Sequence, residues 1–504
     1  METDENCIPI IAGAGEITDR ASDPMLAMEP AALMAEALSR AEQDAGAGLV
    51  ANLDSLDVIN EVSWPYIDVC AEVAGRAKLS PRRAVYGPVG GQTPVQAIHD
   101  AALRIARGES TIAAICGAEA EHAVRQAAKA GVKLPWRGRD ESHVPIRAGT
   151  FQHPAARALD AATPAHVYPF YENAIQKTWG QTPAEGQEES AEVWAGYSAV
   201  AATRPNAWLT RPYEAEEIRT ISPQNRLIAW PYLKLMTANP IVNQGAAIIV
   251  TSAGHARRAG IPPERVIHIL GGAAAQEPHD YLARDSYERV CAMQAVLAAI
   301  QRLLPPGRDG FDHYELYSCF PCIPKMARRL LGLGPGTPLT VTGGLTFFGA
   351  PLNNYMAHAA AAMVERLRAN PGQTGLLYGQ GGYATKHHAL ALASGEAPRR
   401  LLAAGYDVQL QAEALRLPIP RLVPDFEGPA RLETFTILFG RGGEPRHGVA
   451  IARPSPETRL IARVSAQHTE TIAMLMSANA NPIGAAGRTA LGPDGLLQWR
   501  FVQC

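Results

Sequence analysis

The chain has 504 residues, 47% of them hydrophobic and 19% charged, and a formal net charge of −3 at pH 7. This length predicts about three structural units around a large core. The slightly negative charge argues against nucleic-acid binding, and no run of about 18 apolar residues predicts a membrane span.

Seven cysteines are scattered along the chain, and only Cys319 and Cys322 lie close together in sequence. An odd, dispersed set is typical of a reduced protein rather than of a disulfide scaffold. The first ten residues contain acids but no basic residue, unlike a secretory signal. We therefore expect a cytoplasmic protein. The cysteine pair lacks further ligands at suitable spacing, so we expect no metal site.

Residues 8–120 alternate short apolar runs with helical patterns. Ile8–Gly13 and Thr111–Cys116 predict strands, whereas Pro30–Gln43 and Pro94–Arg107 predict helices. A proline at the start of the last helix suits the first helical turn. This region therefore begins an α/β core.

Residues 121–245 are richer in charge, proline and tryptophan, and predict a loop domain that leaves the core. The alternation of strands and helices then resumes, which indicates a buried sheet. The predicted strands cover residues 246–252, 266–270, 314–317 and 375–377, and the predicted helices cover 285–303, 324–331 and 354–368.

The last part of the chain has a different pattern. A linker rich in proline covers residues 403–428, and three short β-like runs follow at Glu433–Phe439, His447–Ala452 and Arg459–Ser465. Glycine- and proline-rich turns separate these runs. The pattern predicts a small all-β domain over residues 425–504.

Two stretches of the core resemble each other. The first reads GPVGGQTPVQAIHDAALRIARGESTIAAICGAEA and the second reads VTGGLTFFGAPLNNYMAHAAAAMVERLRANPGQTGLLYGQGG. Each runs from a Gly-Gly loop through an alanine-rich helix to an apolar strand, which predicts a duplicated core. The positive N-terminal end of each helix suits an oxyanion or a thioester carbonyl.

These residues resemble the thiolase superfamily. PYLKLMTANPIVNQGAAIIVTS (231–252), ELYSCF (315–320), GGLTFFGAP (343–351) and YGQGG (378–382) stand in the order of the family's motifs. The resemblance implies a duplicated thiolase fold, with a layered αβαβα core, a loop domain and an added small all-β domain similar to an oligonucleotide/oligosaccharide-binding fold. It implies an N-terminal half over 1–255, containing the loop domain at 121–245, and a C-terminal half over 256–405.

Thiolases break or form β-ketoacyl-CoA with a nucleophilic cysteine, an activating histidine and a second cysteine. The resemblance therefore implies a coenzyme A thioester as substrate or ligand, no permanently bound cofactor, a homodimer and a place in lipid metabolism. This sequence departs from the family at each reacting position. Gly91 stands for the nucleophile, Ala350 for the histidine and Tyr378 for the second cysteine, while Tyr317 replaces an Asn or His. Glycine and alanine carry no titratable group, so we do not expect the usual mechanism.

Four residues remain as catalytic candidates. Tyr317 is the first, as an acid or base of a non-cysteine site, or else as a buried tyrosine. Cys319 is a substitute nucleophile or a small buried side chain. His387, after the glycine turn, is a base or part of a solvated helix start, and Tyr378 holds the second-cysteine position.

For coenzyme A, Arg226 and Lys234 lie near aromatic residues of the loop domain, and cations beside aromatic rings suit adenine and phosphates. Asn353 can donate to a thioester oxygen, although helix capping is the simpler interpretation.

Three functions remain open. The first is an acyltransferase or carbon–carbon bond enzyme on a CoA thioester, as in bacterial thiolase-like proteins with an extra β-domain that are often labelled acetyl-CoA acetyltransferases. The second is a retro-aldol lyase, as in thiolase-fold aldolases that carry a tyrosine in the motif matching 315–320 and work with a separate β-domain partner. The third is a non-catalytic acyl-CoA-binding or scaffold protein.

Overall fold

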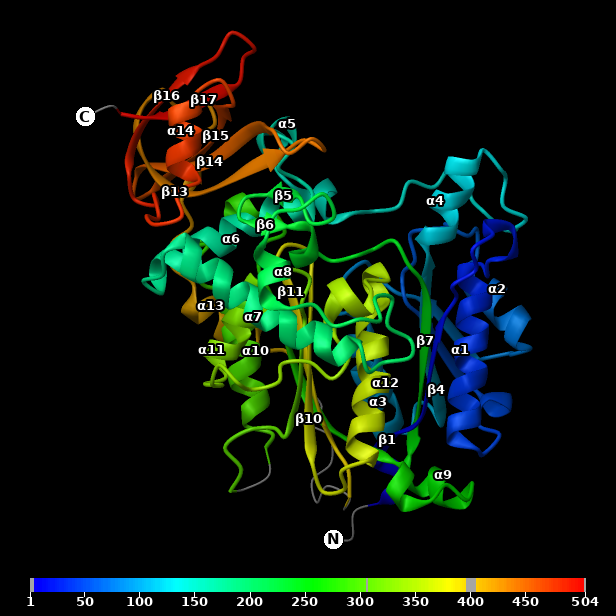
Figure 1. Cartoon of the computed structure of the whole chain (residues 1–504). Coiled ribbons are helices and arrows are strands. Elements are labelled where there is room, and N and C mark those ends of the chain that lie inside the picture. The colour runs from blue at the N-terminus through cyan, green and yellow to red at the C-terminus, as the bar shows by residue number, and fades with distance from the viewer. Residues whose placement is uncertain (1–3, 305–306, 396–404, 503–504) are drawn as a thin grey trace.

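The computed structural model describes residues 4–304, 307–395 and 405–502 (Figure 1). Its larger sheet has nine strands in the order β3-β2-β4-β7-β1-β8-β11-β10-β9. The strands of the N-terminal half are β1 (Pro9–Thr18), β2 (Ser55–Val58), β3 (Arg83–Tyr86), β4 (Ile112–Ala120) and β7 (Asn243–Ser252). Those of the C-terminal half are β8 (Ile267–Gln276), β9 (His313–Leu316), β10 (Thr374–Gly381) and β11 (Lys386–Ala393).

The sheet confirms the predicted duplication. The order β2-β4-β7-β1 in one half matches β9-β10-β11-β8 in the other, and in each half the first pair is parallel and the next two pairs are antiparallel. The halves meet where Ile10 pairs with His268 and Ile11 with Ile267. Each half thus places its alanine-rich helix in the equivalent position.

Helices form layers on both sides of the strands. The inner layer consists of α3 (Thr93–Ala106) and α12 (Tyr355–Arg368), which contact each other. The outer layers contain α1 (Pro30–Ala45) against β1, β4 and β7, and α10 (Cys291–Gln301) against β8 and β11. The smaller helices α2 (Val69–Ala77), α9 (Ala253–Arg258) and α11 (Cys322–Leu330) flank these layers.

Strand β7 shows why the core is layered. Ala247 and Ile249 pack into the same hydrophobic cluster as α1, whereas Ile248 and Val250 pack into the cluster that contains α3 and α12. Successive side chains of a strand point to opposite faces, so a continuous apolar run serves two cores at once. The αβαβα core predicted from the sequence is therefore confirmed.

The loop domain and the C-terminal domain share one sheet. The loop domain contributes α4 (Glu121–Ala130), α5 (Pro154–Ala158), α6 (Pro164–Thr178), α7 (Pro183–Ala201), α8 (Ala215–Arg219), β5 (Leu227–Ala229) and β6 (Tyr232–Leu233). The C-terminal region contributes α13 (Gln409–Leu415), β12 (Arg421–Leu422), β13 (Gly428–Phe439), β14 (Pro445–Ser455), β15 (Thr458–Ser465), α14 (Thr469–Leu475), β16 (Ala486–Leu491) and β17 (Leu497–Phe501).

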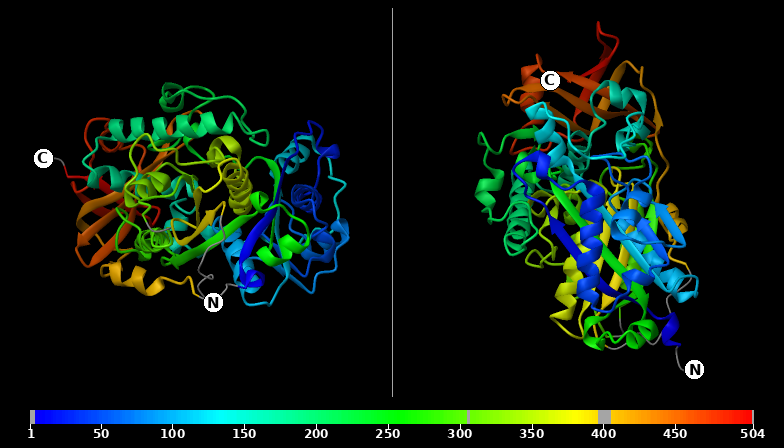
Figure 2. Two further views of the ribbon diagram at one scale, coloured as in Figure 1. Left: turned by 90° about the horizontal axis from the view of Figure 1, so that it is seen from below. Right: turned by 90° about the vertical axis from the view of Figure 1, so that its right-hand side faces the viewer.

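Their sheet runs β12-β15-β17-β16-β13-β5-β6, and β14 pairs with β13 and β15. The predicted β-rich C-terminal domain is present, at one end of the molecule beyond the loop-domain helices (Figure 2). The continuation of its sheet into β5 was not visible in the sequence.

A fully buried ion pair joins the loop domain to the C-terminal half. Lys325 on α11 and Glu172 on α6 both have side chains that are 0% exposed. The Lys325 amine also donates to the Ser190 hydroxyl at 2.8 Å, and the Tyr232 hydroxyl donates to Glu172 at 2.8 Å. Each charge therefore depends on partners from other elements.

We expect Lys325→Met to lower the free energy of unfolding by about 3–5 kcal/mol, because Glu172 would remain buried without its cation. The matched control is Arg125→Met, which breaks an ion pair with Glu121 on the surface of α4 and should change stability by less than about 0.5 kcal/mol. Urea unfolding of both variants tests this, and equal losses would contradict it.

Candidate functional site

A cavity of about 470 Å³ lies where the start of α3, the approach to α12, the end of β10 and the loop domain meet. Its lining is mostly apolar and aromatic. Its polar side chains are those of Arg147, Thr163, Tyr168, Thr237, Tyr317, Cys319, Asn353, Gln380 and Tyr383. Gly91 and Ala350, which the sequence resemblance assigned to the positions of the family's nucleophile and histidine, both line it.

The two helix starts are connected through Asn353. The N–H of Gly90, just before α3, donates to Asn353 Oδ1 at 2.9 Å, and Asn353 Nδ2 donates to the carbonyl of Asn60 at 3.0 Å. Helix capping, the simpler interpretation from the sequence, is wrong here, because Asn354 is the N-cap residue of α12 and its side chain makes no capping hydrogen bond. Asn353 instead joins the two halves at the cavity wall.

Tyr317 closes the space beside Gly91. A Cβ placed on Gly91 would lie 2.2 Å from the Tyr317 hydroxyl and 2.6 Å from the carbonyl oxygen of Gln380. Contacts this short do not occur, so the close approach of the phenol requires a glycine at this position. Tyr317 is fixed in turn by its own N–H, which donates to the carbonyl of Tyr378 at 3.0 Å.

Burial raises the pKa of Tyr317 well above its usual value, with Cys319 as a smaller cause. The phenol is therefore neutral at pH 7. It can donate a hydrogen bond or a proton, and it is a poor base from its resting state.

Cys319 lies beside Tyr317 in a small polar cluster. Gln380 Nε2 donates to Cys319 Sγ at 3.2 Å and to the Tyr168 hydroxyl at 2.6 Å, and that hydroxyl donates to the carbonyl of Gly382 at 2.8 Å. Burial raises the pKa of Cys319 to about 12. A thiol in this state is not a nucleophile at neutral pH, because only the thiolate attacks.

Tyr378 and His387 pair with each other outside the cavity lining. The Tyr378 hydroxyl and His387 Nδ1 are 2.7 Å apart, and their rings are stacked. Burial lowers the pKa of His387 to about 4. The alternative of a helix start after the glycine turn is wrong, because Lys386–Ala393 forms strand β11. His387 lies against a separate pocket beside Lys386 and Gln92.

The predicted coenzyme A residues Arg226 and Lys234 do not line the cavity. Arg226 donates to the carbonyl of Leu227 at 3.0 Å, and Lys234 is exposed. Instead, Arg147 is the charged residue of the lining, and its side chain is exposed. Sequence reasoning missed Arg147 and Tyr168, which lie in the irregular loop domain. It also missed Gln380, although this residue stands inside the quoted YGQGG motif.

The cavity has a limited set of acids and bases. Among the described residues that line it, none is Asp, Glu, His or Lys. The described parts of the chain also contain no group of three His, Cys, Asp or Glu side chains suited to a metal ion. The lining therefore offers hydrogen-bond donors and neutral acids rather than a resting base.

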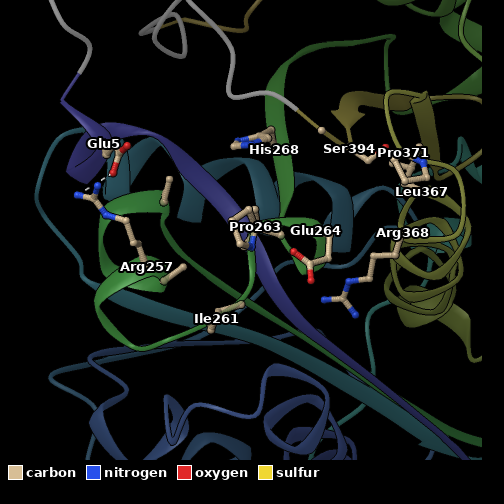
Figure 3. A pocket seen from close by; sticks show the side chains of 14 residues that line it. Glu5, Arg257, Ile261, Pro263, Glu264, His268, Leu367, Arg368, Pro371 and Ser394 are labelled. Carbon is tan, nitrogen blue, oxygen red and sulfur yellow. Dashed lines mark ion pairs between the residues drawn. The ribbon is translucent and has the colours of Figure 1, made fainter.

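A different cavity of about 590 Å³ lies near the C-terminal end of α12, whereas the candidate site lies near the N-terminal end of this helix (Figure 3). Arg257 forms an ion pair with Glu5 at its rim, at 3.0 Å. His268, of which 4% is exposed, lies in its wall. None of the residues predicted to carry chemistry belongs to this cavity.

Comparison with known proteins supports the fold and the added C-terminal domain. A model of the thiolase-like protein type 1 additional C-terminal domain matches residues 409–494. A search of curated proteins gives no significant match. The described helices include none that is long and apolar enough to cross a membrane.

Three solved structures are similar to the chain. A monomeric SCP2-thiolase like protein type 1 from Mycobacterium smegmatis has a TM-score of 0.82 and 26% identity, with 99% of each chain covered. An Ltp2-ChsH2(DUF35) aldolase has a TM-score of 0.57 and 20% identity, with 77% of this chain and 98% of that chain covered. The dimeric peroxisomal thiolase of Saccharomyces cerevisiae has a TM-score of 0.57 and 12% identity, with coverages of 78% and 98%.

The chain is thus a thiolase-fold protein with an additional C-terminal domain. In particular, it is similar over its whole length to the SCP2-thiolase like protein type 1 of Mycobacterium smegmatis, and its C-terminal region has the domain described for thiolase-like protein type 1.

We expect iodoacetamide at pH 7.5 to leave Cys319 unmodified in the folded protein, since its high pKa and burial leave almost no accessible thiolate. Cys7, which is partly exposed, is the internal control and should react. Peptide mass spectrometry measures both. Alkylation of Cys319 at a rate similar to that of Cys7 would show that a reactive thiol lies in the cavity.

Proposed function

We propose that the protein binds an acyl-CoA thioester in the cavity and acts on it without forming an acyl-enzyme. The observation that carries this proposal is the overlap of the Tyr317 hydroxyl with the space beside Gly91. The position from which thiolases attack the thioester is filled by a hydrogen-bond donor. A thioester that enters the cavity meets a neutral phenol in place of a thiolate.

Several features support thioester binding. The N-terminal end of α3 carries partial positive charge, which favours a carbonyl oxygen that gains negative charge. The apolar and aromatic lining suits an acyl chain and the pantetheine arm. Arg147 places a positive charge at the mouth, where it can meet a phosphate of coenzyme A.

The same groups suit reactions that pass through an oxyanion, which is a tetrahedral intermediate in acyl transfer and an enolate in carbon–carbon bond chemistry. In acyl transfer or carbon–carbon bond chemistry on a thioester, negative charge develops on the carbonyl oxygen. Tyr317 can donate to that oxygen, and the helix end stabilises it further. In acyl transfer, the acyl group would pass directly from the CoA thioester to a second bound substrate.

A second candidate is a retro-aldol lyase on a β-hydroxyacyl-CoA. The tyrosine at position 317 favours this reaction, because thiolase-fold aldolases carry a tyrosine in the matching motif. One similar structure is also described as an aldolase. In this reaction the bond between the α- and β-carbons breaks, and the β-carbon becomes an aldehyde or ketone. The Tyr317 hydroxyl gives its proton to the α-carbon and receives the β-hydroxyl proton, so the proton count balances without a separate base.

The third candidate is a non-catalytic acyl-CoA-binding or scaffold protein, which the absence of a resting base among the described lining residues favours.

A homodimer, a cytoplasmic location and a role in lipid metabolism remain predictions. Light scattering decides the first, since one similar protein is described as monomeric and another as dimeric.

We expect Gly91→Cys to form no acetyl adduct with acetyl-CoA in intact-mass measurements. The new side chain overlaps Tyr317, and Ala350 supplies no imidazole to activate the thiol. Overpacking should also lower the free energy of unfolding by about 1–3 kcal/mol. Gly91→Cys combined with Tyr317→Ala is the matched variant that relieves part of the overlap. An adduct in the single variant would show that position 91 is still a catalytic position.

We expect Tyr317→Phe to abolish any turnover of acetyl-CoA, acetoacetyl-CoA or β-hydroxyacyl-CoAs, because it removes the donated proton but keeps the ring. Loss of one hydrogen bond of this kind should lower affinity by only about three- to ten-fold. Product analysis and calorimetry measure the two effects. Tyr383→Phe is the control, since its hydroxyl already donates to the carbonyl of Ala162. Micromolar binding by the wild type without turnover would favour the scaffold function.

A further inference from the structure

Helix α6 connects the C-terminal domain to the candidate site. Its first turns contribute Pro164, Ala165 and Tyr168 to the cavity lining. Tyr168 also stacks on Phe320, with ring centroids 4.6 Å apart. The helix is buried on all sides from Val167 to Gln176. Its position therefore depends on whatever packs behind it.

Strand β13 of the C-terminal domain packs behind α6 through specific hydrogen bonds. The Thr434 hydroxyl donates to the carbonyl of Phe170 at 2.6 Å, and Asn173 Nδ2 donates to the carbonyl of Phe435 at 2.8 Å. Asn481, from the same domain, donates to the carbonyl of Asn173 at 3.0 Å. Thr434 is 0% exposed and Asn173 is 1% exposed, so water does not compete for the two bonds that these side chains donate.

A second connection runs through the shared sheet. The N–H of Trp230 donates to the carbonyl of Ile437 at 2.9 Å, and Leu438 pairs with Ala229. The chain then continues to Thr237 and Ala238, which line the cavity, and the N–H of Ala238 donates to the carbonyl of Cys319 at 3.1 Å. Two separate parts of the cavity wall are therefore attached to one strand.

We propose that the C-terminal domain is an internal support of the acyl-CoA cavity, in which Thr434 and Asn173 act as positioning residues that hold α6 and place Tyr168 in the cavity wall. The ligand part of this inference rests on the proposed function. Apolar packing alone would be enough to attach a domain that has no effect on the site. Buried hydrogen bonds to the helix that lines the site add little net stability but require good geometry, so they fix the position of this helix.

Strand β13 offers a matched pair of substitutions. Thr434 and Thr436 lie two residues apart on the same strand and are both 0% exposed, but Thr436 Oγ1 has no hydrogen-bond partner among the described residues. Thr434→Val removes the bond to α6, whereas Thr436→Val removes a hydroxyl that bonds nothing. Thr434→Ser keeps the hydroxyl and serves as the rescue variant.

The experiment measures the Kd of the full-length protein for acetyl-CoA and the hydrogen exchange of residues 164–171 and 380–383. Thr434→Val should weaken binding by about three- to ten-fold and speed exchange in both segments, while Thr436→Val and Thr434→Ser should match the wild type. Equal behaviour of Thr434→Val and Thr436→Val in both measurements would overturn the inference.

The two proposals fail in different ways. If the wild type does not bind acetyl-CoA, the proposed function fails with that ligand, and hydrogen exchange alone decides whether β13 supports the cavity wall. If the wild type binds and Thr434→Val changes neither affinity nor exchange, the support inference fails while the proposed function stands. A lower Tm of Thr434→Val without local changes in exchange also overturns it.

Discussion

The Tyr317 hydroxyl occupies the space that any side chain at position 91 would need. A phenol and a cysteine side chain cannot occupy the same space, so the presence of one excludes the other. The same cavity wall also lacks an imidazole at position 350. These features act together, since a thiol without a base, or a base without a thiol, would give little covalent catalysis.

The surrounding fold holds the framework of the cavity in place. The duplicated halves bring two alanine-rich helices together in the inner layer, and Asn353 joins their starts by bonding both Gly90 and Asn60. The oriented peptide groups at a helix start belong to the backbone and persist when side chains change. The cavity therefore keeps backbone groups that can stabilise negative charge, although the described residues at positions 91 and 350 carry no titratable side chain.

Much of the fold followed from the sequence, because the repeated Gly-Gly loop, helix and strand are local patterns. The order of the motifs also located Gly91, Ala350 and Tyr317 at one cavity. The position along β10 at which side chains reach the cavity was harder to predict. Tyr378 lies two residues, or about 7 Å, before Gln380 on this strand. Gln380 lines the cavity, whereas Tyr378 pairs with His387 outside its lining.

The parts that sequence reasoning missed depend on contacts between distant segments. Arg147 and Tyr168 come from the loop domain, which has no repeating pattern to place its residues against the core. The pairing of Leu438 with Ala229 joins segments about 200 residues apart, and such pairings leave no trace in local periodicity. Through this pairing, the C-terminal domain is joined to the loop domain by a continuous sheet. The sheet of this domain includes loop-domain strands. In the proposed support role, a change in the core of the domain acts on the cavity wall through α6 rather than through direct contact with a ligand.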